Sequence, residues 1–329
     1  MSQHPPAALL PGATLGVMGG GQLGRMFVHA AQRLGYFTAV LDPDATSPAG
    51  RVSHHHLHAD YLDTAALAEL VRLADAITTE FENVPAQALA QLAAHRPVAP
   101  GGEAVAIAQD RALEKAHFTR CGVPCAPHAL IESPEQLAAV GDALLPGILK
   151  TARLGYDGKG QARVANRTEL LAAWQAMQSG NPPHATVCVL EKMLPLAAEC
   201  SVVLARGQDG QMVHLPVQAN LHRDGILAVT EVGDGALDPA LASQALAAAR
   251  EVAQGLDYVG VLCVEFFVLQ PVAPGGQPSL VVNEIAPRPH NSGHHSIDSS
   301  DVSQFDLQVR CMAGLPLVPP RAHSAAVML

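Results

Sequence analysis

Residues 280–294, LVVNEIAPRPHNSGH, are the most informative stretch of the chain, because they put the carboxylate of Glu284 inside an apolar strand. A second apolar run, residues 261–269, carries Glu265 in the same way. Burying an unpaired carboxylate is costly, so two such acids that point inward from neighbouring strands indicate a bound cation. Mg²⁺ between protein and nucleotide phosphates prefers hard oxygen ligands, which these acids and Asn283 offer. The sequence therefore predicts a magnesium site at Glu265 and Glu284; the alternative is a pair of outward-facing glutamates.

A dense set of polar donors follows this strand directly. Arg288, His290 and Asn291 are of the kind that holds an oxyanion during group transfer. The many histidines also suggest zinc, but their spacing matches no closed zinc site. We therefore expect this segment to bind an oxyanion.

Residues 155–161, GYDGKGQ, are the most telling local segment. Three glycines within six residues, together with Lys159, predict a hairpin whose amides fold over phosphates. The segment is not a P-loop, because no G-K-[ST] ends it. Lys150, at the end of the preceding strand, and Arg111, at the start of a helix, offer further charge for phosphates.

The first hundred residues alternate short apolar runs (15–18, 38–41 and 76–79) with amphipathic stretches (22–34, 64–74 and 85–95). Such alternation predicts a parallel, doubly wound sheet. Residues 19–24, GGGQLG, fit the G-x-G-x-x-G fingerprint after the first strand, and Asp42 follows the second. Glycines there permit a tight turn whose amides attract an anion. A nicotinamide or flavin cofactor, another phosphate ligand and a purely structural turn are all compatible with this pattern.

Residues 79–84, TEFENV, follow the third strand, where loops of a parallel sheet face the ligand. Glu80, Glu82 and Asn83 can hydrogen-bond a ribose or a base, and a solvated capping loop is the alternative. The histidine-rich residues 54–58 predict a solvated loop rather than a metal site.

From about Gln109 onward the pattern predicts an α+β section with antiparallel hairpins. Strands are expected near 147–151, 161–164, 187–191, 201–206 and 211–218, and a helix at 239–256. Glu191 and Glu199 flank a proline-containing turn at 192–198, and residues 220–225, with His222, are expected to form a polar loop. Either acid can hold a ligand's hydroxyls or amine, or lie on a solvated edge.

Composition excludes several function classes. The 329 residues carry a formal net charge of −10, and no run of five Lys or Arg occurs, so nucleic acid and anionic membranes are not expected partners. No segment has the ~18 uninterrupted apolar residues of a membrane-spanning helix, and the N-terminus lacks a signal peptide pattern. Six scattered cysteines predict buried thiols rather than disulfides. We expect a cytoplasmic protein.

Taken in order, these motifs resemble the ATP-grasp superfamily, and within it the N5-carboxyaminoimidazole ribonucleotide synthases of purine biosynthesis. The resemblance implies an α/β and α+β fold: a Rossmann-like substrate domain at 1–100, an ATP-grasp domain at 101–316 with a lid at about 125–195, and the start of a truncated C-terminal domain at 317–329. Family members continue further and supply basic residues for the substrate phosphate there, so we expect a complete ATP site and altered substrate affinity.

The resemblance also implies the reaction. ATP, bicarbonate and 5-aminoimidazole ribonucleotide would give the N5-carboxylated nucleotide, ADP and phosphate through carboxyphosphate, with two Mg²⁺ ions, no NAD and a homodimeric enzyme. Another ATP-grasp ligase, a non-catalytic nucleotide-binding remnant and, from the glycine fingerprint alone, an NAD-dependent dehydrogenase remain alternatives.

Carried over residue by residue, the resemblance implies three groups besides the metal ligands Glu265 and Glu284. The ATP site would comprise Arg111, Lys150, Tyr156, Asp157, Gly158, Lys159, Gly160, Gln161, Glu191, Lys192, Met193, Leu194, Glu199, His222, Asn283 and Glu284. The catalytic group around bicarbonate and the reacting amine would comprise Tyr156, Asp157, Lys159, Arg288, His290 and Asn291. The substrate end would comprise Gly19, Gly20, Gly21, Gln22, Leu23, Glu80 and Asn83.

Overall fold

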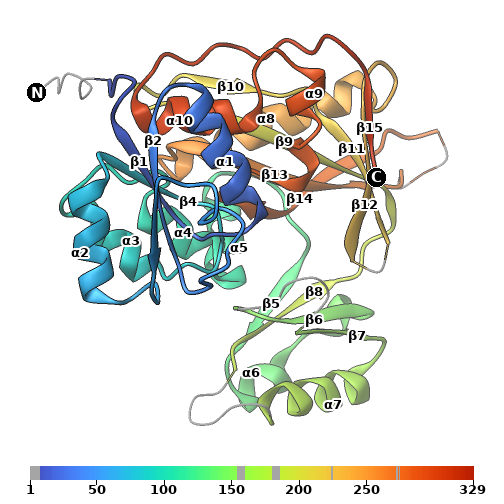
Figure 1. Cartoon of the computed structure of the whole chain (residues 1–329). Helices are drawn as coiled ribbons and strands as arrows, with labels where there is room; N and C mark the ends of the chain where they lie inside the picture. Colours follow the sequence, from blue (N-terminus) through green and yellow to red (C-terminus); the bar gives the residue numbers. More distant parts are fainter. Residues whose placement is uncertain (1–7, 154–159, 180–185, 224, 272, 274) are drawn as a thin grey trace, which may run out of the picture.

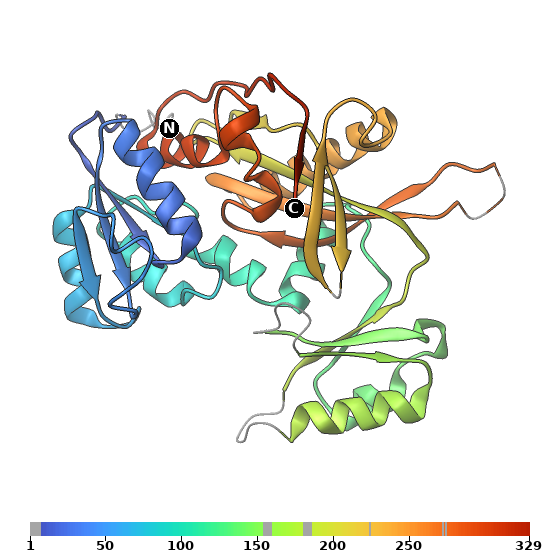
Figure 2. The ribbon, with the colours of Figure 1, turned by 45° about the vertical axis from the view of Figure 1, so that its right-hand side comes forward.

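Three β-sheets organise the chain in the computed structural model, which describes residues 8–153, 160–179, 186–223, 225–271, 273 and 275–329. Two sheets have four strands and the central one has seven. Figures 1 and 2 show the first sheet beside the central sheet, with the third sheet set apart below them.

The first sheet is parallel, in the order β3-β2-β1-β4, as the alternating pattern predicts. Its strands are β1 (Thr14–Met18), β2 (Phe37–Asp42), β3 (His55–His58) and β4 (Ala76–Thr79). The helices around it are α1 (Gln22–Arg33), α2 (Thr64–Leu73), α3 (Ala86–Ala93) and α4 (Gly102–Ala108). Both faces are covered, so the central strands β1 and β2 are almost entirely buried.

The prediction of a solvated loop at residues 54–58 is wrong, because β3 pairs with β2 as an edge strand. Its outer position leaves the imidazoles of His55 and His58 exposed, while Leu57 packs against the core. An edge strand has one paired side, so its polar composition resembles that of a loop.

The central sheet has the order β14-β13-β9-β11-β12-β15, with β10 beside β9, and all its pairings are antiparallel. Its strands are β9 (Leu196–Arg206), β10 (Met212–His214), β11 (Gln218–Arg223), β12 (Ile226–Val232), β13 (Gly260–Leu269), β14 (Ser279–Ala286) and β15 (Ala326–Met328). Helix α8 (Pro239–Gly255) packs on one face and α10 (Gln304–Ala313) on the other, so the sheet separates two apolar cores.

The third sheet, β5-β8-β6-β7, is antiparallel and has its own core. Its strands are β5 (His128–Ile131), β6 (Gly147–Thr151), β7 (Gln161–Val164) and β8 (Cys188–Lys192). Helices α6 (Pro134–Ala139) and α7 (Arg167–Gln178) cover the face turned away from the rest of the molecule (Figure 1). The open face therefore looks toward the central sheet.

Three further expectations need correction. β9 begins at Leu196, so the turn after β8 is shorter than predicted and Glu199 lies within a strand. Residues 220–223 belong to β11 rather than to a loop, because they pair with β12. The predicted strand at 211–218 is divided between β10 and β11. Polar residues alternate along β11 because Gln218 and Asn220 hydrogen-bond to Ser201 while His222 lines a cavity, which makes the sequence resemble a solvated loop.

All six cysteines lie in described segments and are free thiols; four are buried, whereas Cys121 and Cys125 are half-buried, so the expectation of six buried thiols is wrong for these two. In the described part of the chain, no helix is long and apolar enough to cross a membrane.

Candidate active site

A cavity of about 720 Å³ lies where the three sheets meet. Its wall comes from the loop after β4 (Glu82, Asn83), from helix α5 (Arg111–Arg120), from β6 and β7, and from β9, β11, β13 and β14 of the central sheet. This volume falls within the range of small-molecule sites. Because all three units contribute, the cavity exists only in the assembled fold.

Glu265 and Glu284 both line this cavity, as the sequence predicts. In the β13–β14 ladder, Val264 pairs with Ile285 and Phe266 with Val282, so Glu265 stands opposite the two residues Asn283 and Glu284. This arrangement is a β-bulge, which redirects side chains next to a site. The bulge is the reason that successive residues of β14 both reach the cavity.

The donor set around the bulge fits a hard divalent cation. Asn283 Oδ1 is buried, and among the described residues no hydrogen-bond donor reaches it. Arg111 Nη1 lies 3.1 Å from Glu284 Oε2, and His290 Nε2 lies 3.0 Å from Glu265 Oε1. Two carboxylates and an amide oxygen are the ligand types that Mg²⁺ takes from proteins.

Two lysines converge on Glu191 beneath the cavity. Lys150 Nζ donates to Oε2 at 2.9 Å, Lys115 Nζ lies 3.1 Å from Oε1 as an ion pair, and all three side chains are buried. Burial alone would raise the pKa of Glu191, but the two ammonium groups outweigh it and lower the pKa to about 2. Lys150 lines the cavity, whereas Glu191 lies behind it and acts through the lysines.

The sequence analysis missed Lys115 and Glu114, although their spacing from Arg111 along the helix could have indicated them. Together with Arg111, they occupy positions i, i+3 and i+4 of helix α5, so one helix face carries three charges. Glu114 accepts from the Ile285 backbone amide at 2.8 Å, and burial raises its pKa to about 8. Lys115 donates to the Asn283 carbonyl at 3.1 Å, so this face fixes β14 beside the cavity.

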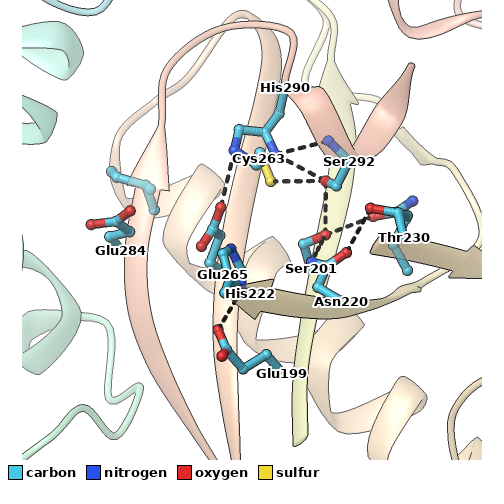
Figure 3. A network of polar contacts seen from close by, with 12 residues as sticks. Glu199, Ser201, Asn220, His222, Thr230, Cys263, Glu265, Glu284, His290 and Ser292 are labelled. Atoms are coloured by element: carbon cyan, nitrogen blue, oxygen red, sulfur yellow. Dashed lines mark hydrogen bonds and ion pairs between the residues drawn. The ribbon is translucent and has the colours of Figure 1, made fainter. Parts of the chain in front are cut away.

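A chain of polar contacts runs behind His290 (Figure 3). Ser292 Oγ lies 2.9 Å from His290 Nδ1 and accepts from Ser201 Oγ at 2.8 Å, and Asn220 Nδ2 donates to Ser201 Oγ at 2.8 Å. Thr230 then donates to Asn220 Oδ1 at 3.1 Å. Four strands or loops are thus joined at one point, which fixes the imidazole ring against Glu265.

Two more ion pairs complete the wall. His222 Nδ1 lies 2.8 Å from Glu199 Oε2, and this carboxylate raises the pKa of His222 against the opposing effect of burial. Arg288 Nε donates to Glu82 Oε2 at 2.9 Å and thereby ties the loop after β14 to the first-sheet unit. The sequence suggests Glu82 as a ligand of a ribose or base, but gives no sign of its ion pair with Arg288.

The glycine turn lies outside the cavity lining. The amides of Gly21 and Gly24 donate to the Glu80 carboxylate, each at 2.8 Å, and the Gly20 amide donates to Asp42 at 2.7 Å. The protein's own carboxylates therefore fill the positions that a phosphate would take at this helix start. Gly19, at a φ of +102°, makes the sharp turn that brings these amides together.

The predicted site residues divide into three groups. The cavity lining brings together Asn83, Arg111, Lys150, Gly160, Gln161, Glu199, His222, Glu265, Asn283, Glu284, Arg288, His290 and Asn291. Outside the lining lie Gly19, Gly20, Gly21, Gln22, Leu23, Glu80, Glu191, Lys192, Met193 and Leu194. Outside the described residues lie Tyr156, Asp157, Gly158 and Lys159.

Comparison with known proteins agrees with this geometry. The ATP-grasp domain model matches residues 116–305, and the ribonucleotide synthetase preATP-grasp domain model matches residues 12–109. The N5-carboxyaminoimidazole ribonucleotide synthase of Brucella melitensis is 43% identical over 322 residues, covering 98% of this chain and 86% of that protein. The chain belongs to the N5-carboxyaminoimidazole ribonucleotide synthase family.

Solved members of the N5-carboxyaminoimidazole ribonucleotide synthase family share the fold. The Staphylococcus aureus synthetase complexed with ADP has a TM-score of 0.88 at 36% identity, covering 97% of this chain and 82% of that one. The Aspergillus clavatus synthase in complex with ADP and 5-aminoimidazole ribonucleotide has a TM-score of 0.84 at 29% identity, covering 97% and 81%. The predicted fold class and the assignment to ATP-grasp ligases of purine biosynthesis are confirmed. The comparisons support this family over the dehydrogenase alternative.

Proposed function

We propose that the cavity carries out the ATP-dependent carboxylation of 5-aminoimidazole ribonucleotide with bicarbonate. The observation that supports this proposal is that one cavity is lined by three kinds of group. They are cationic side chains suited to phosphates, a pair of carboxylates at a β-bulge, and a cluster of hydrogen-bond donors suited to an oxyanion. In the reaction, a bicarbonate oxygen attacks the γ-phosphorus of ATP and ADP leaves. The exocyclic amine of the nucleotide then attacks the carboxyphosphate carbon, and phosphate leaves with the bonding pair.

ATP binds with its base at the apolar end of the cavity. Ile148, Leu196 and Phe267 line that end, and the Glu199–His222 pair beside them offers hydrogen bonds to the base and ribose. Arg111 and Lys150 bind the phosphates from two different units. Contacts by Tyr156, Asp157, Gly158 and Lys159 with the phosphates, and by Lys192, Met193 and Leu194 with the base, stay predictions.

Glu265, Glu284 and Asn283 hold magnesium in this proposal. When bound, Mg²⁺ lowers the charge repulsion between ATP and an incoming anion. Arg111 keeps the Glu284 carboxylate ionised and oriented through its 3.1 Å contact. Lys115 and Glu114 fix the backbone of β14 on either side of Glu284 and so hold the ligand strand in place.

Bicarbonate and carboxyphosphate bind at the opposite end, against Arg288, His290 and Asn291. Preorganised donors of this kind stabilise developing negative charge. Carboxyphosphate hydrolyses in open water, so the site has to exclude solvent during transfer. We assign this role to the third-sheet unit, the lid of the predicted domain division, whose open face looks toward the central sheet.

The substrate nucleotide enters from the first-sheet side, where Glu82 and Asn83 reach the cavity. Residues Gly19 to Leu23 and Glu80 shape that entrance rather than bind phosphate, since Glu80 and Asp42 occupy the amides of the turn. In this proposal the enzyme is also a homodimer and acts in the cytoplasm, where a purine-biosynthesis enzyme is expected to work.

The testing experiment measures ADP release with Mg-ATP and bicarbonate, with and without 5-aminoimidazole ribonucleotide. Release that rises with the nucleotide, together with uptake of labelled bicarbonate into the product, is the expected result. Nucleotide-independent release would instead indicate uncoupled carboxyphosphate formation or another acceptor. ATP binding without any release would favour a non-catalytic remnant.

A further inference from the structure

Cys263 lies next to the site but has no part in the proposed reaction. It is on β13 two residues before Glu265, so both side chains point to the same face of the central sheet. His290 approaches that face from the loop after β14. One donor atom from each of the three residues, a sulfur, a carboxylate oxygen and a ring nitrogen, lies within 4.8 Å of the other two (Figure 3). Within the described part of the chain, this is the one trio of metal-ligating groups at such spacing.

The spacing suits a tetrahedral cation with little rearrangement. Ligand atoms about 2.0–2.3 Å from a zinc-like ion stand roughly 3.3–3.8 Å from one another in a tetrahedral site. His290 Nε2 and Glu265 Oε1 are already 3.0 Å apart, and the third donor falls within 4.8 Å. Three protein ligands with an open fourth position form a common arrangement for zinc.

The surroundings of Cys263 fix its sulfur in place and shield it from bulk solvent. Cys263 is fully buried, and its Sγ lies 3.9 Å from Ser292 Oγ. Ser292 also fixes His290 Nδ1, which leaves Nε2 directed at Glu265. Glu265 and His290 line the cavity, so an ion reaches the sulfur through the cavity and not from bulk solvent.

We infer that Cys263, Glu265 and His290 form a binding site for a thiophilic divalent cation of the zinc class. The site shares Glu265 with the magnesium site, so its occupation excludes Mg²⁺ from that carboxylate and removes His290 from the oxyanion cluster. Its consequence is inhibition by zinc in competition with Mg²⁺ at Glu265, so added Mg²⁺ raises the zinc concentration that is needed for half-inhibition. The inhibitory half of this inference rests on the proposed function; the binding half does not.

The binding test uses Co²⁺ alone as a spectroscopic probe, with no nucleotide present. The unmodified protein should show a sulfur-to-cobalt charge-transfer band that saturates at one equivalent, and Cys263→Ser should lack it. The matched control is the double variant Cys121→Ser, Cys125→Ser, because these half-buried thiols lie beside His117 and His128. That control should keep the band. A band absent from the unmodified protein, or retained in Cys263→Ser, overturns the inference.

The inhibition test titrates buffered free Zn²⁺ against ADP release at fixed Mg-ATP. Cys263→Ser should need at least about tenfold more zinc for half-inhibition, with basal turnover unchanged. Equal zinc sensitivity in both proteins overturns the inhibitory half. A cobalt band in a protein that lacks nucleotide-dependent turnover would refute the proposed function and leave the metal site standing. Circular dichroism of each variant establishes that it is folded.

Discussion

Arg288 Nε donates to Glu82 Oε2 at 2.9 Å, a contact between residues 206 positions apart in the chain. Glu82 belongs to the first-sheet unit, whereas Arg288 follows strand β14 of the central sheet. The guanidinium faces the cavity, so the carboxylate of one unit orients a catalytic candidate of another. Arg288 Nη2 donates to the same oxygen, so two charge-assisted hydrogen bonds hold the guanidinium against this carboxylate.

Glu82→Gln should therefore lower kcat by about tenfold with little change in the KM for ATP, because Arg288 loses its ionic anchor at the bicarbonate end. Steady-state ADP release checks this. The matched control is Glu69→Gln, which breaks the exposed Glu69–Arg72 pair and should leave kcat unchanged. A rise in the KM for ATP at constant kcat would contradict the assignment.

Ser292→Ala removes the hydroxyl that fixes His290 Nδ1. We expect kcat to fall about ten- to a hundredfold, because a misplaced reacting group slows the reaction by about that factor, and we expect ATP affinity to be unchanged. Ser243→Ala, which removes an exposed hydroxyl bound to the Pro239 carbonyl on α8, is the control. ATP affinity is measured by calorimetry. A kcat of Ser292→Ala within twofold of the unmodified protein's, a change of about 0.4 kcal/mol in activation free energy, would show that the serine has no positioning role.

Glu284→Gln should raise the Mg²⁺ concentration for half-maximal activity by at least about tenfold, because an amide is a weaker ligand for Mg²⁺ than a carboxylate. The substitution keeps an acceptor for Arg111, so the fold is preserved. Magnesium titration of ADP release checks the expectation. Glu251→Gln, on the exposed side of α8, should leave the titration unchanged. An identical magnesium requirement in Glu284→Gln would remove this residue from the metal site.

Glu191→Gln leaves two buried ammonium groups without their counter-ion, which should lower the free energy of unfolding at pH 7 by about 3 kcal/mol. The pKa of Glu191 is lowered from 4.5 to about 2, since the effect of Lys150 and Lys115 outweighs burial. A lowered pKa means that the stabilisation is complete above 4.5 and is lost as pH falls toward 2. The difference between the two proteins should shrink over that interval.

Urea unfolding at a series of pH values measures that difference directly. Glu251→Gln again provides the control, and its difference from the unmodified protein should stay near zero at every pH. A deficit of Glu191→Gln that did not change between neutral and acid pH would show that the carboxylate's charge is not what stabilises the pair of lysines.

Much of the fold followed from local pattern. The alternation of apolar runs and amphipathic stretches predicted the parallel sheet β1, β2 and β4, and the two acids within apolar strands marked β13 and β14. Polar strands were missed: β3 and β11 look like loops because one side of each is at an edge or faces a cavity. Hydrophobic periodicity reveals a strand by its buried apolar side chains, so it does not reveal a strand that buries few of them.

Local sequence pattern indicated which residue types are available to bind a phosphate, a cation and an oxyanion, because a carboxylate in an apolar strand needs a partner and a glycine-rich turn exposes backbone amides. The tertiary fold then brings a subset of these residues into one cavity. It put Lys115 and Lys150 on one carboxylate, joined Arg288 to Glu82, and filled the glycine-turn amides with Glu80 and Asp42. These pairings depend on distances between segments far apart in the chain, and local sequence pattern carries no record of such distances.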